Sequence, residues 1–158
     1  TTYALLVEEA YDQFVHAVTA AVSQSATPTI RMEHQCYQVN SSVSQLFPVV
    51  SFNFKGGASL VLTPEQYLVQ SAWDVAGMWC LGFWKNPRLT VLGDLVLKDR
   101  IFVYDLVHQQ IGWANYNCAS TANVSISREY FVNPAQWSSR SWLPLAINSV
   151  FLFVTWLR

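Results

Sequence analysis

The sequence predicts a mainly β domain with one long amphipathic helix near its N-terminus. Apolar residues recur at steps of three and four over residues 7–24, which is the period of a helix with one buried face. From residue 35 onward the pattern changes to short apolar runs separated by turn residues, which is typical of strands. The chain has 158 residues, 52% of them hydrophobic, which suffices for one domain with a substantial core.

The predicted helix has its apolar face at Val7, Ala10, Tyr11, Phe14, Val15, Val18, Ala21 and Val22. Glu8, Glu9 and Asp12 lie in its first turns, where the helix dipole favours negative charge. Pro28 lacks a backbone N–H and cannot continue a helix, so we expect the helix to end before it.

The strands follow in a regular order. They are predicted at residues 36–39, 49–54, 59–62, 79–83, 89–92, 101–105 and 110–115. Thr63 and Pro64 open a short helical turn through Leu68, because proline fits the first position of a helix. A second helical turn is expected at 95–99, and the last two strands form a hairpin across the loop 106–109.

The charge pattern excludes two classes of protein. Charged residues make up 12% of the chain, about half the usual share, which argues against disorder because disorder needs high charge and low hydrophobicity. The net charge is −1 and no basic run is present, so a nucleic-acid partner is not expected.

The C-terminal part differs from the body. We divide the chain into a domain at 1–118, a polar spacer at 119–141 and an apolar tail at 142–158. Pro144 and Asn148 interrupt the tail, whereas a membrane span needs about 20 apolar residues. Small residues at Ser138 and Ser139, followed by an apolar end, resemble a signal for a lipid (GPI) anchor. A membrane-inserted tail and a C-terminal strand or helix docked on the body remain as alternatives.

The cysteines and sequons point to an oxidising compartment. The cysteines are Cys36, Cys80 and Cys118, and an odd count leaves one without an internal partner. Glycosylation sequons at Asn40 and Asn123 fit the secretory route, so we expect an extracellular or cell-surface protein. The cysteine and histidine spacings fit no zinc site, and we predict neither a metal nor a cofactor.

The common hydrolase and nucleotide motifs G-x-S-x-G, H-E-x-x-H and the P-loop are missing from the sequence. Asp94 is the one carboxylate within an apolar strand context. It is either a buried acid–base group with a raised pKa or the N-cap of the helical turn at 95–99, and the second interpretation is favoured because Asp is a preferred N-cap.

Three segments together resemble the C-terminal end of pepsin-like aspartic proteases. They are Thr90-Val91-Leu92-Gly93-Asp94, Ile101-Phe102-Val103-Tyr104-Asp105 and Gln110-Ile111-Gly112-Trp113-Ala114. The family has an apolar pair and Gly-Asp, a short helix, a strand ending in Asp, a turn, and Ile/Val-Gly-Trp/Leu-Ala.

Other segments resemble the plant branch of this family, which holds nucellin- and nepenthesin-like proteases and the related xylanase inhibitors. These segments are Phe47-Pro48, Phe52-Asn53-Phe54, Gly56-Gly57-Ala58 and Pro64-Glu65-Gln66-Tyr67-Leu68. The resemblance covers Thr1 to about Cys118 and implies the C-terminal lobe of a bilobal acid protease fold.

The resemblance also locates the catalytic motif, Asp-Thr/Ser-Gly. In plant members this motif runs on into a helix with Val-Glu-Glu-Ala-Tyr, which is present here as Val7–Tyr11. Thr1 and Thr2 align with the residues just after the motif glycine, so the catalytic Asp is expected three positions before Thr1. The other catalytic Asp belongs to the N-terminal lobe, and neither is in this chain.

The expected activity is peptide-bond hydrolysis by two carboxylates. The pair lies about 3 Å apart and shares one proton, because both cannot ionise at that distance. One carboxylate activates water while the other protonates the carbonyl oxygen. The resemblance implies a peptide substrate and the N-terminal lobe of the same protein as partners, and predicts that this chain alone is inactive. The alternative is a non-catalytic inhibitor or binding protein on the same fold.

The remaining site residues are also implied by the resemblance. Thr1, Thr2 and Val91 are expected to line the substrate cleft, and Gly93 to pack under the loop that carries the aspartate. Cys36 and Cys80 match the disulfide of the C-terminal lobe. Cys118 is expected to be unpaired here, because its partner would lie upstream of Thr1.

Overall fold

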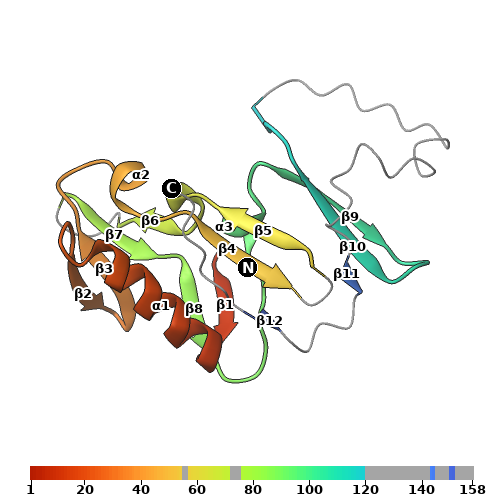
Figure 1. Cartoon of the computed structure of the whole chain (residues 1–158), viewed down its shortest axis with the longest axis horizontal. Helices are drawn as coiled ribbons and strands as arrows, with labels where there is room; N and C mark the ends of the chain where they lie inside the picture. Colours follow the sequence, from red (N-terminus) through yellow and green to blue (C-terminus); the bar gives the residue numbers. More distant parts are fainter. Residues whose placement is uncertain (55–56, 72–75, 120–142, 145–149, 152–158) are drawn as a thin grey trace.

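The computed structural model describes residues 1–54, 57–71, 76–119, 143–144 and 150–151. Strands dominate it, with one long helix near the N-terminus (Figure 1), so the expected fold class is confirmed. The helices are α1 (Glu8–Val22), α2 (Val43–Leu46), α3 (Asp94–Leu97) and a 3-10 turn, η1 (Pro64–Gln66). The strands are β1 (Ala4–Val7), β2 (Thr27–Arg31), β3 (His34–Gln38), β4 (Val50–Phe54), β5 (Ser59–Leu62), β6 (Leu68–Gln70), β7 (Met78–Leu81), β8 (Phe83–Asn86), β9 (Arg100–Asp105), β10 (Gln110–Asn115), β11 (Leu143–Pro144) and β12 (Val150–Phe151).

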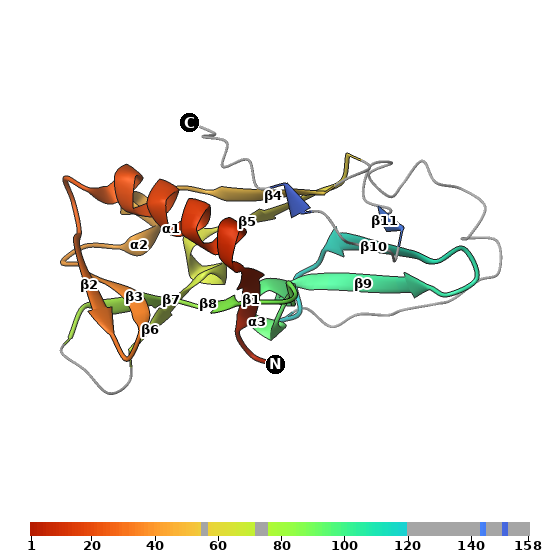
Figure 2. The same cartoon turned by 90° about the horizontal axis from the view of Figure 1, so that it is seen from below.

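The sheets combine local hairpins with long-range pairs. A four-stranded sheet has the order β2-β3-β7-β6, and β4 pairs with β5. The predicted hairpin at the end of the domain is present as β9 and β10, which run out from the body (Figure 2). Strand β1 pairs in parallel with β8, with Leu5 opposite Trp84. The N-terminus is thereby fixed to a strand nearly eighty residues away.

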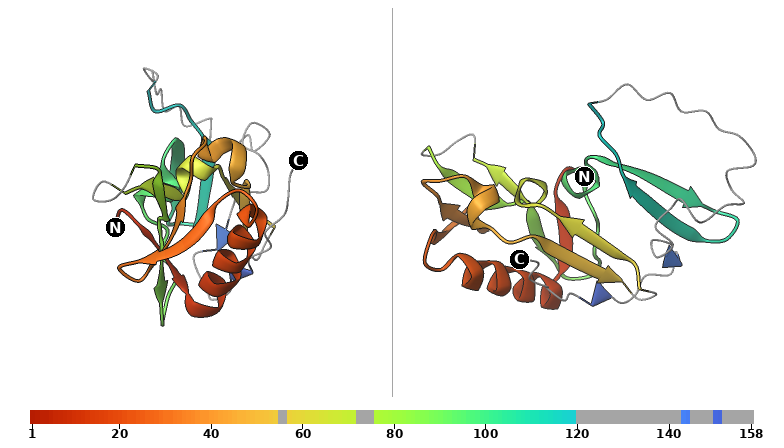
Figure 3. Two further views of the ribbon diagram at one scale, coloured as in Figure 1. Left: turned by 90° about the vertical axis from the view of Figure 1, so that its left-hand side faces the viewer. Right: turned by 45° about the horizontal axis from the view of Figure 1, so that its top comes forward.

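The helix α1 covers one flank of the strands (Figure 3). Its buried residues are Ala10, Tyr11, Phe14, Val18 and Val22, which belong to the predicted apolar face. Phe14 lies 4.8 Å from Phe83 and 5.9 Å from Phe52 between ring centroids, and Phe52 stacks on Phe83. These rings join the helix to β4 and β8 in one core.

Buried tyrosines fix two further parts of this core. The hydroxyl of Tyr67 donates to the carbonyl oxygen of Pro48 at 2.7 Å, and burial raises its pKa. The hydroxyls of Tyr37 and Thr19 lie 2.8 Å apart, which ties β3 to α1. Burial raises the pKa of Tyr37 to about 12, because the phenolate would lose its hydration.

Two of the predicted strands differ in the structure. The strand predicted at 79–83 breaks at Gly82, which separates β7 from β8 and whose N–H donates to the carbonyl of Tyr67. The strand predicted at 89–92 is only an isolated bridge between Leu5 and Val91.

Most of the spacer and tail lies outside the described residues, as do the sequon at Asn123 and the serines proposed as anchor sites. The short strand β11 pairs with β10, and β12 pairs with β4. Among the described residues, no helix has the length and apolar character that a membrane crossing requires. The lipid anchor therefore stays a prediction.

Candidate functional site

The N-terminal segment (Thr1–Tyr3) is held at the start of α3. The backbone N–H of Asp94 donates to the carbonyl oxygen of Thr1, and that of Leu95 to the carbonyl oxygen of Thr2, both at 3.0 Å. The first N–H groups of a helix have no partner inside the helix, so they are free to bind a neighbouring strand. The side chains of Thr1 and Thr2 are exposed.

Gly93 packs directly against this segment. A Cβ atom at Gly93 would lie 2.2 Å from the carbonyl oxygen of Tyr3 and 2.7 Å from that of Thr2. Both contacts are to backbone, which cannot turn aside as a flexible side chain can. Only glycine allows so close an approach of the two chains.

Val91 lies on the other side of β1. Its N–H and carbonyl exchange hydrogen bonds with Leu5 at 2.9 and 2.8 Å, and its side chain is half-buried. Thr90 adds a bond from its hydroxyl oxygen to the N–H of Val7. The structure thus brings all four candidates, Thr1, Thr2, Val91 and Gly93, together near the start of β1. Their proposed contacts with substrate remain predictions.

Asp94 corrects part of the sequence interpretation. The N-cap of α3 is Gly93, and Asp94 is the first residue of the helix, so the cap prediction was wrong by one position. Asp94 is exposed, which contradicts the alternative of a buried acid–base group. Its charge still lies at the N-terminus of a helix, where the dipole stabilises it.

The described carboxylates do not build a catalytic pair. None of them is buried, and three contact the side chain of Lys85 or of His108. Lys85 bridges Glu8 at 3.2 Å and Asp12 at 2.8 Å. Asp105 accepts from the backbone N–H of His108 and lies 2.7 Å from its ring, contacts that lower the pKa of Asp105.

A ring stack also touches the N-terminal segment, and the sequence analysis missed it. The ring of Trp84 stacks on Tyr3, with centroids 4.9 Å apart and planes at 22°, and on His34, at 4.7 Å and 21°. The rings come from the segment before β1, from β8 and from β3. No periodicity in the sequence could have found a contact among three such distant positions.

A shallow hollow lies elsewhere, at the base of the β9–β10 hairpin. It is lined by Val61, Thr63, Gln66, Asp99, Arg100, Asn115, Tyr116 and Asn117, and none of the cleft candidates is among them. The guanidinium of Arg100 donates to the carbonyls of Val61, Val96 and Lys98 and to Oε1 of Gln66. Burial lowers the pKa of Arg100, with nearby Asp99 opposing the shift. These bonds join four segments, so the hollow has a structural role.

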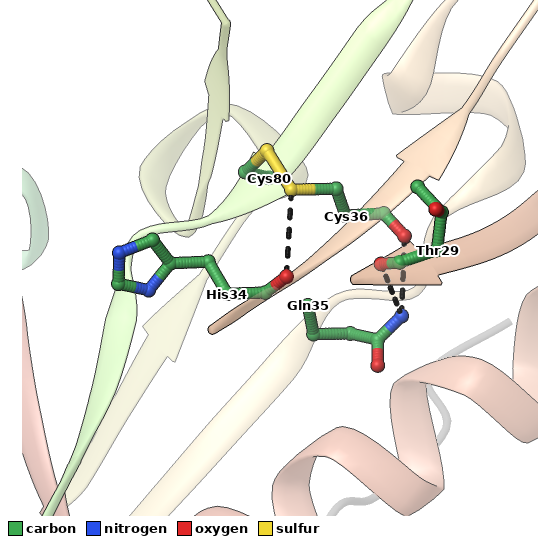
Figure 4. The surroundings of a disulfide bond; sticks show 5 residues. All are labelled: Thr29, His34, Gln35, Cys36 and Cys80. Atoms are coloured by element: carbon green, nitrogen blue, oxygen red, sulfur yellow. Dashed lines mark hydrogen bonds between the residues drawn. A yellow bond between two sulfur atoms is a disulfide. The ribbon is translucent and has the colours of Figure 1, made fainter. Parts of the chain in front are cut away.

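The disulfide between Cys36 and Cys80 is present, as the resemblance implied (Figure 4). The two residues are directly opposite each other on β3 and β7. The Nε2 of Gln35 donates to the carbonyls of Thr29 and Cys36, which ties β2 to the same place.

Two other predicted sites can be located. Cys118 is exposed and carries no disulfide in the described part of the chain. Asn40 is exposed on a bend before α2, a placement open to modification. Within the described residues, no group of three or more His, Cys, Asp or Glu side chains is arranged to hold a metal ion.

Comparison with known proteins identifies the family. The family model described as xylanase inhibitor C-terminal matches residues 1–115. The chain belongs to this family. The chain is 33% identical over 132 residues to aspartic proteinase 36 of Arabidopsis thaliana. This match covers 78% of the chain and 26% of that protein. It is 31% identical over 132 residues to aspartic proteinase 39 of Arabidopsis thaliana, which covers 78% of the chain and 27% of that protein.

A shorter match, 31% identical over 86 residues, relates this chain to an aspartic proteinase of Oryza sativa subsp. indica. It covers 48% of the chain and 20% of that protein. The chain spans about a quarter of the length of the Arabidopsis relatives it matches. These matches confirm the resemblance to plant pepsin-like aspartic proteases and to the C-terminal lobe of their fold.

Proposed function

We propose that this domain is the C-terminal lobe of an aspartic endopeptidase and forms one wall of a peptide-binding cleft. The observation that carries the proposal is how Thr1–Tyr3 is held. The first amides of α3 bind the carbonyls of Thr1 and Thr2, and Gly93 packs against the backbone of the same segment. These contacts fix the direction in which the chain from upstream enters the domain. A catalytic loop needs that precision, because misplacing a reacting group by about 1 Å costs about a hundredfold in rate.

The described residues of this chain do not supply the chemistry by themselves. The mechanism needs two close carboxylates with one shared proton, and the described carboxylates are exposed, half-buried or paired with Lys85 or the ring of His108. Both aspartates are assigned to segments outside this sequence, one three positions before Thr1 and one in an N-terminal lobe. The substrate of the longer protein is a peptide or protein bound between the two lobes.

The first test is to determine the coding sequence upstream of Thr1. Two Asp-Thr/Ser-Gly motifs, one of them directly preceding Thr1, support the endopeptidase. The longer protein is then expected to hydrolyse peptides at acidic pH and to lose this activity when either aspartate is changed to asparagine. The 158-residue chain alone is the matched control and is expected to be inactive. Hydrolysis by this chain, blocked by a transition-state inhibitor of aspartic proteases, would overturn the proposal.

The second candidate function is a non-catalytic inhibitor or binding protein. The match to the family described as xylanase inhibitor C-terminal favours it, because that description names an inhibitor. Replacement of either upstream aspartate would decide for this alternative. The search would then turn to a protein partner by affinity capture with the longer protein.

We also propose delivery through the secretory pathway to the cell surface. The disulfide and the exposed sequon at Asn40 support this route, since disulfides persist in oxidising compartments. A mass shift on removal of N-linked glycans, smaller in Asn40→Gln, tests the route. Release from membranes by a phospholipase specific for GPI anchors tests the tail, and a protein that stays intact through Arg158 would contradict the anchor.

A further inference from the structure

The ring stack joins two sheets at the place where the N-terminal segment enters the fold. Trp84 lies on β8, next to Phe83 of the core, but its own side chain is 38% exposed. Its ring stacks on those of both Tyr3 and His34, with nearly parallel planes in both cases. Tyr3 directly follows Thr1 and Thr2, whose carbonyls bind α3.

The His34 member of the stack has a rigid support. His34 begins β3, opposite Arg31 across the β2–β3 turn, and lies two residues before Cys36. The disulfide to Cys80 fixes β3 to β7, and β7 leads through Gly82 into β8. The imidazole and the indole are therefore held by two connected strands, while Tyr3 is the member that lies outside any strand.

We propose that Trp84 is a positioning residue that holds the N-terminal segment (Thr1–Tyr3) against α3, with His34 stacking on the same indole. Two kinds of contact hold this one short segment. The stack fixes the side chain of Tyr3, and the amides of Asp94 and Leu95 bind the carbonyls of the two residues before it. Losing the stack frees Tyr3 and weakens these two hydrogen bonds.

We call the stack of Trp84 on Tyr3, together with the two hydrogen bonds from α3, the clamp. Its importance for catalysis rests on the proposed function, but its existence does not. In an endopeptidase the clamped segment follows the catalytic loop, so Trp84 would influence the reaction through the segment and without touching substrate. In a binding protein the same contact would order the surface beside Thr1 and Thr2.

Amide hydrogen exchange measured by NMR on the 158-residue chain tests the clamp. In Trp84→Leu, the amides of Asp94 and Leu95 are expected to exchange about threefold to tenfold faster, given the usual strength of one aromatic contact. The amides of Val96 and Lys98 serve as internal controls, since their acceptors, Gly93 and Asp94, belong to the α3 turn itself. They are expected to keep their rates.

Two variants separate positioning from general destabilisation. Trp84→Phe retains a ring and is expected to restore most of the protection at Asp94 and Leu95. Tyr104→Leu removes an exposed ring from the β9–β10 hairpin and is expected to change neither amide. Unchanged exchange in Trp84→Leu, or an equal increase at Val96 and Lys98, would overturn the proposal.

Tyr3→Leu removes the other ring of the Tyr3–Trp84 contact. It keeps the test decisive if Trp84→Leu folds poorly. It is expected to reproduce the faster exchange at Asp94 and Leu95, and unchanged protection would count against the clamp. The outcome is independent of proteolysis. If the exchange changes as expected but the coding sequence upstream of Thr1 lacks either aspartate, the inference on Trp84 stands and the endopeptidase is removed. If the longer protein is an active protease but the exchange is unaltered, the endopeptidase stands and the inference on Trp84 is removed.

Discussion

The α-carbon of Gly93 lies so close to the backbone of Tyr3 that an added Cβ atom would come within 2.2 Å of the Tyr3 carbonyl oxygen. We expect Gly93→Ala to lower the free energy of unfolding by about 2–3 kcal/mol, because overpacking against backbone forces a shift of the chain. Denaturant unfolding measures this loss.

The control for this substitution is Gly57→Ala. Gly57 has open space around its Cβ position but a φ of +87°, so its cost comes from backbone conformation alone and should be about 1 kcal/mol. Equal losses in the two variants would show that the approach of Gly93 to Tyr3 is not the cause.

The sequence could predict elements whose signal is local. The helix and the β4–β5 and β9–β10 hairpins are periodic segments with turn residues beside them, and all are present. Strand β1 was missed, because the apolar residues Ala4–Val7 lead directly into the helix and become a strand only by pairing with β8. The break at Gly82 was missed for a similar reason, since the chain there binds Tyr67 and Ala4, both distant in sequence.

For the site, the four cleft candidates were available only through resemblance to a known family. No composition or spacing links Thr1 to Gly93, and the hydrogen bonds of α3 to the N-terminal segment are visible only in three dimensions. The ring stack was invisible for the same reason. No sequence pattern singles out Trp84, Tyr3 or His34. They become informative only because their rings are in contact in the structure.

The disulfide gives a second prediction. Cys36→Ser combined with Cys80→Ser should lower the free energy of unfolding by about 3–4 kcal/mol, because the crosslink of 44 residues' separation restricts the unfolded chain. Cys118→Ser is the matched control and should be neutral, since Cys118 is exposed and free. Peptide mapping without reduction should recover Cys36 linked to Cys80. A bond from Cys118 to either of them would contradict this pairing.

Arg100 provides a third prediction, on packing between distant segments. Arg100→Met removes the donors to Val61, Val96, Lys98 and Gln66 and leaves their oxygens without this partner. The expected loss is about 2–3 kcal/mol, from several lost hydrogen bonds to a charged group. Arg88→Met, at an exposed residue, should change the stability by less than about 0.5 kcal/mol. Similar losses at both positions would refute a special role for Arg100.

Asp105 predicts an acid dependence of the β9–β10 hairpin. The backbone N–H of His108, and then its ring, lower the pKa of Asp105 in the folded state. A lowered folded pKa means that the stabilisation is present above the unfolded pKa, about 3.9, and is lost as the pH falls through the folded value. Protection of the His108 amide should therefore fall below about pH 4. In Asp105→Asn this pH dependence should be absent, and its persistence would assign it to another group.

The tip of the same hairpin carries a last prediction, which follows from the proposed second lobe. Tyr104, Leu106 and Val107 are exposed, with Val107 at 86%, although apolar side chains gathered on one surface usually meet a partner. We expect the 158-residue chain to self-associate through this tip when no N-terminal lobe covers it, and light scattering measures the effect. Leu106→Asp with Val107→Asp should reduce the mean particle mass, because charges oppose burial of this surface.

Met32→Asp is the matched control, since Met32 is an equally exposed apolar residue at the tip of a different hairpin, β2–β3. It should leave the association unchanged if the β9–β10 tip is the contact. An equal reduction in both variants would indicate that added negative charge, and not the position, opposes association. A monodisperse monomer of the unaltered chain would contradict this prediction. An uncovered tip that does not self-associate gives no reason to expect a lobe that covers it.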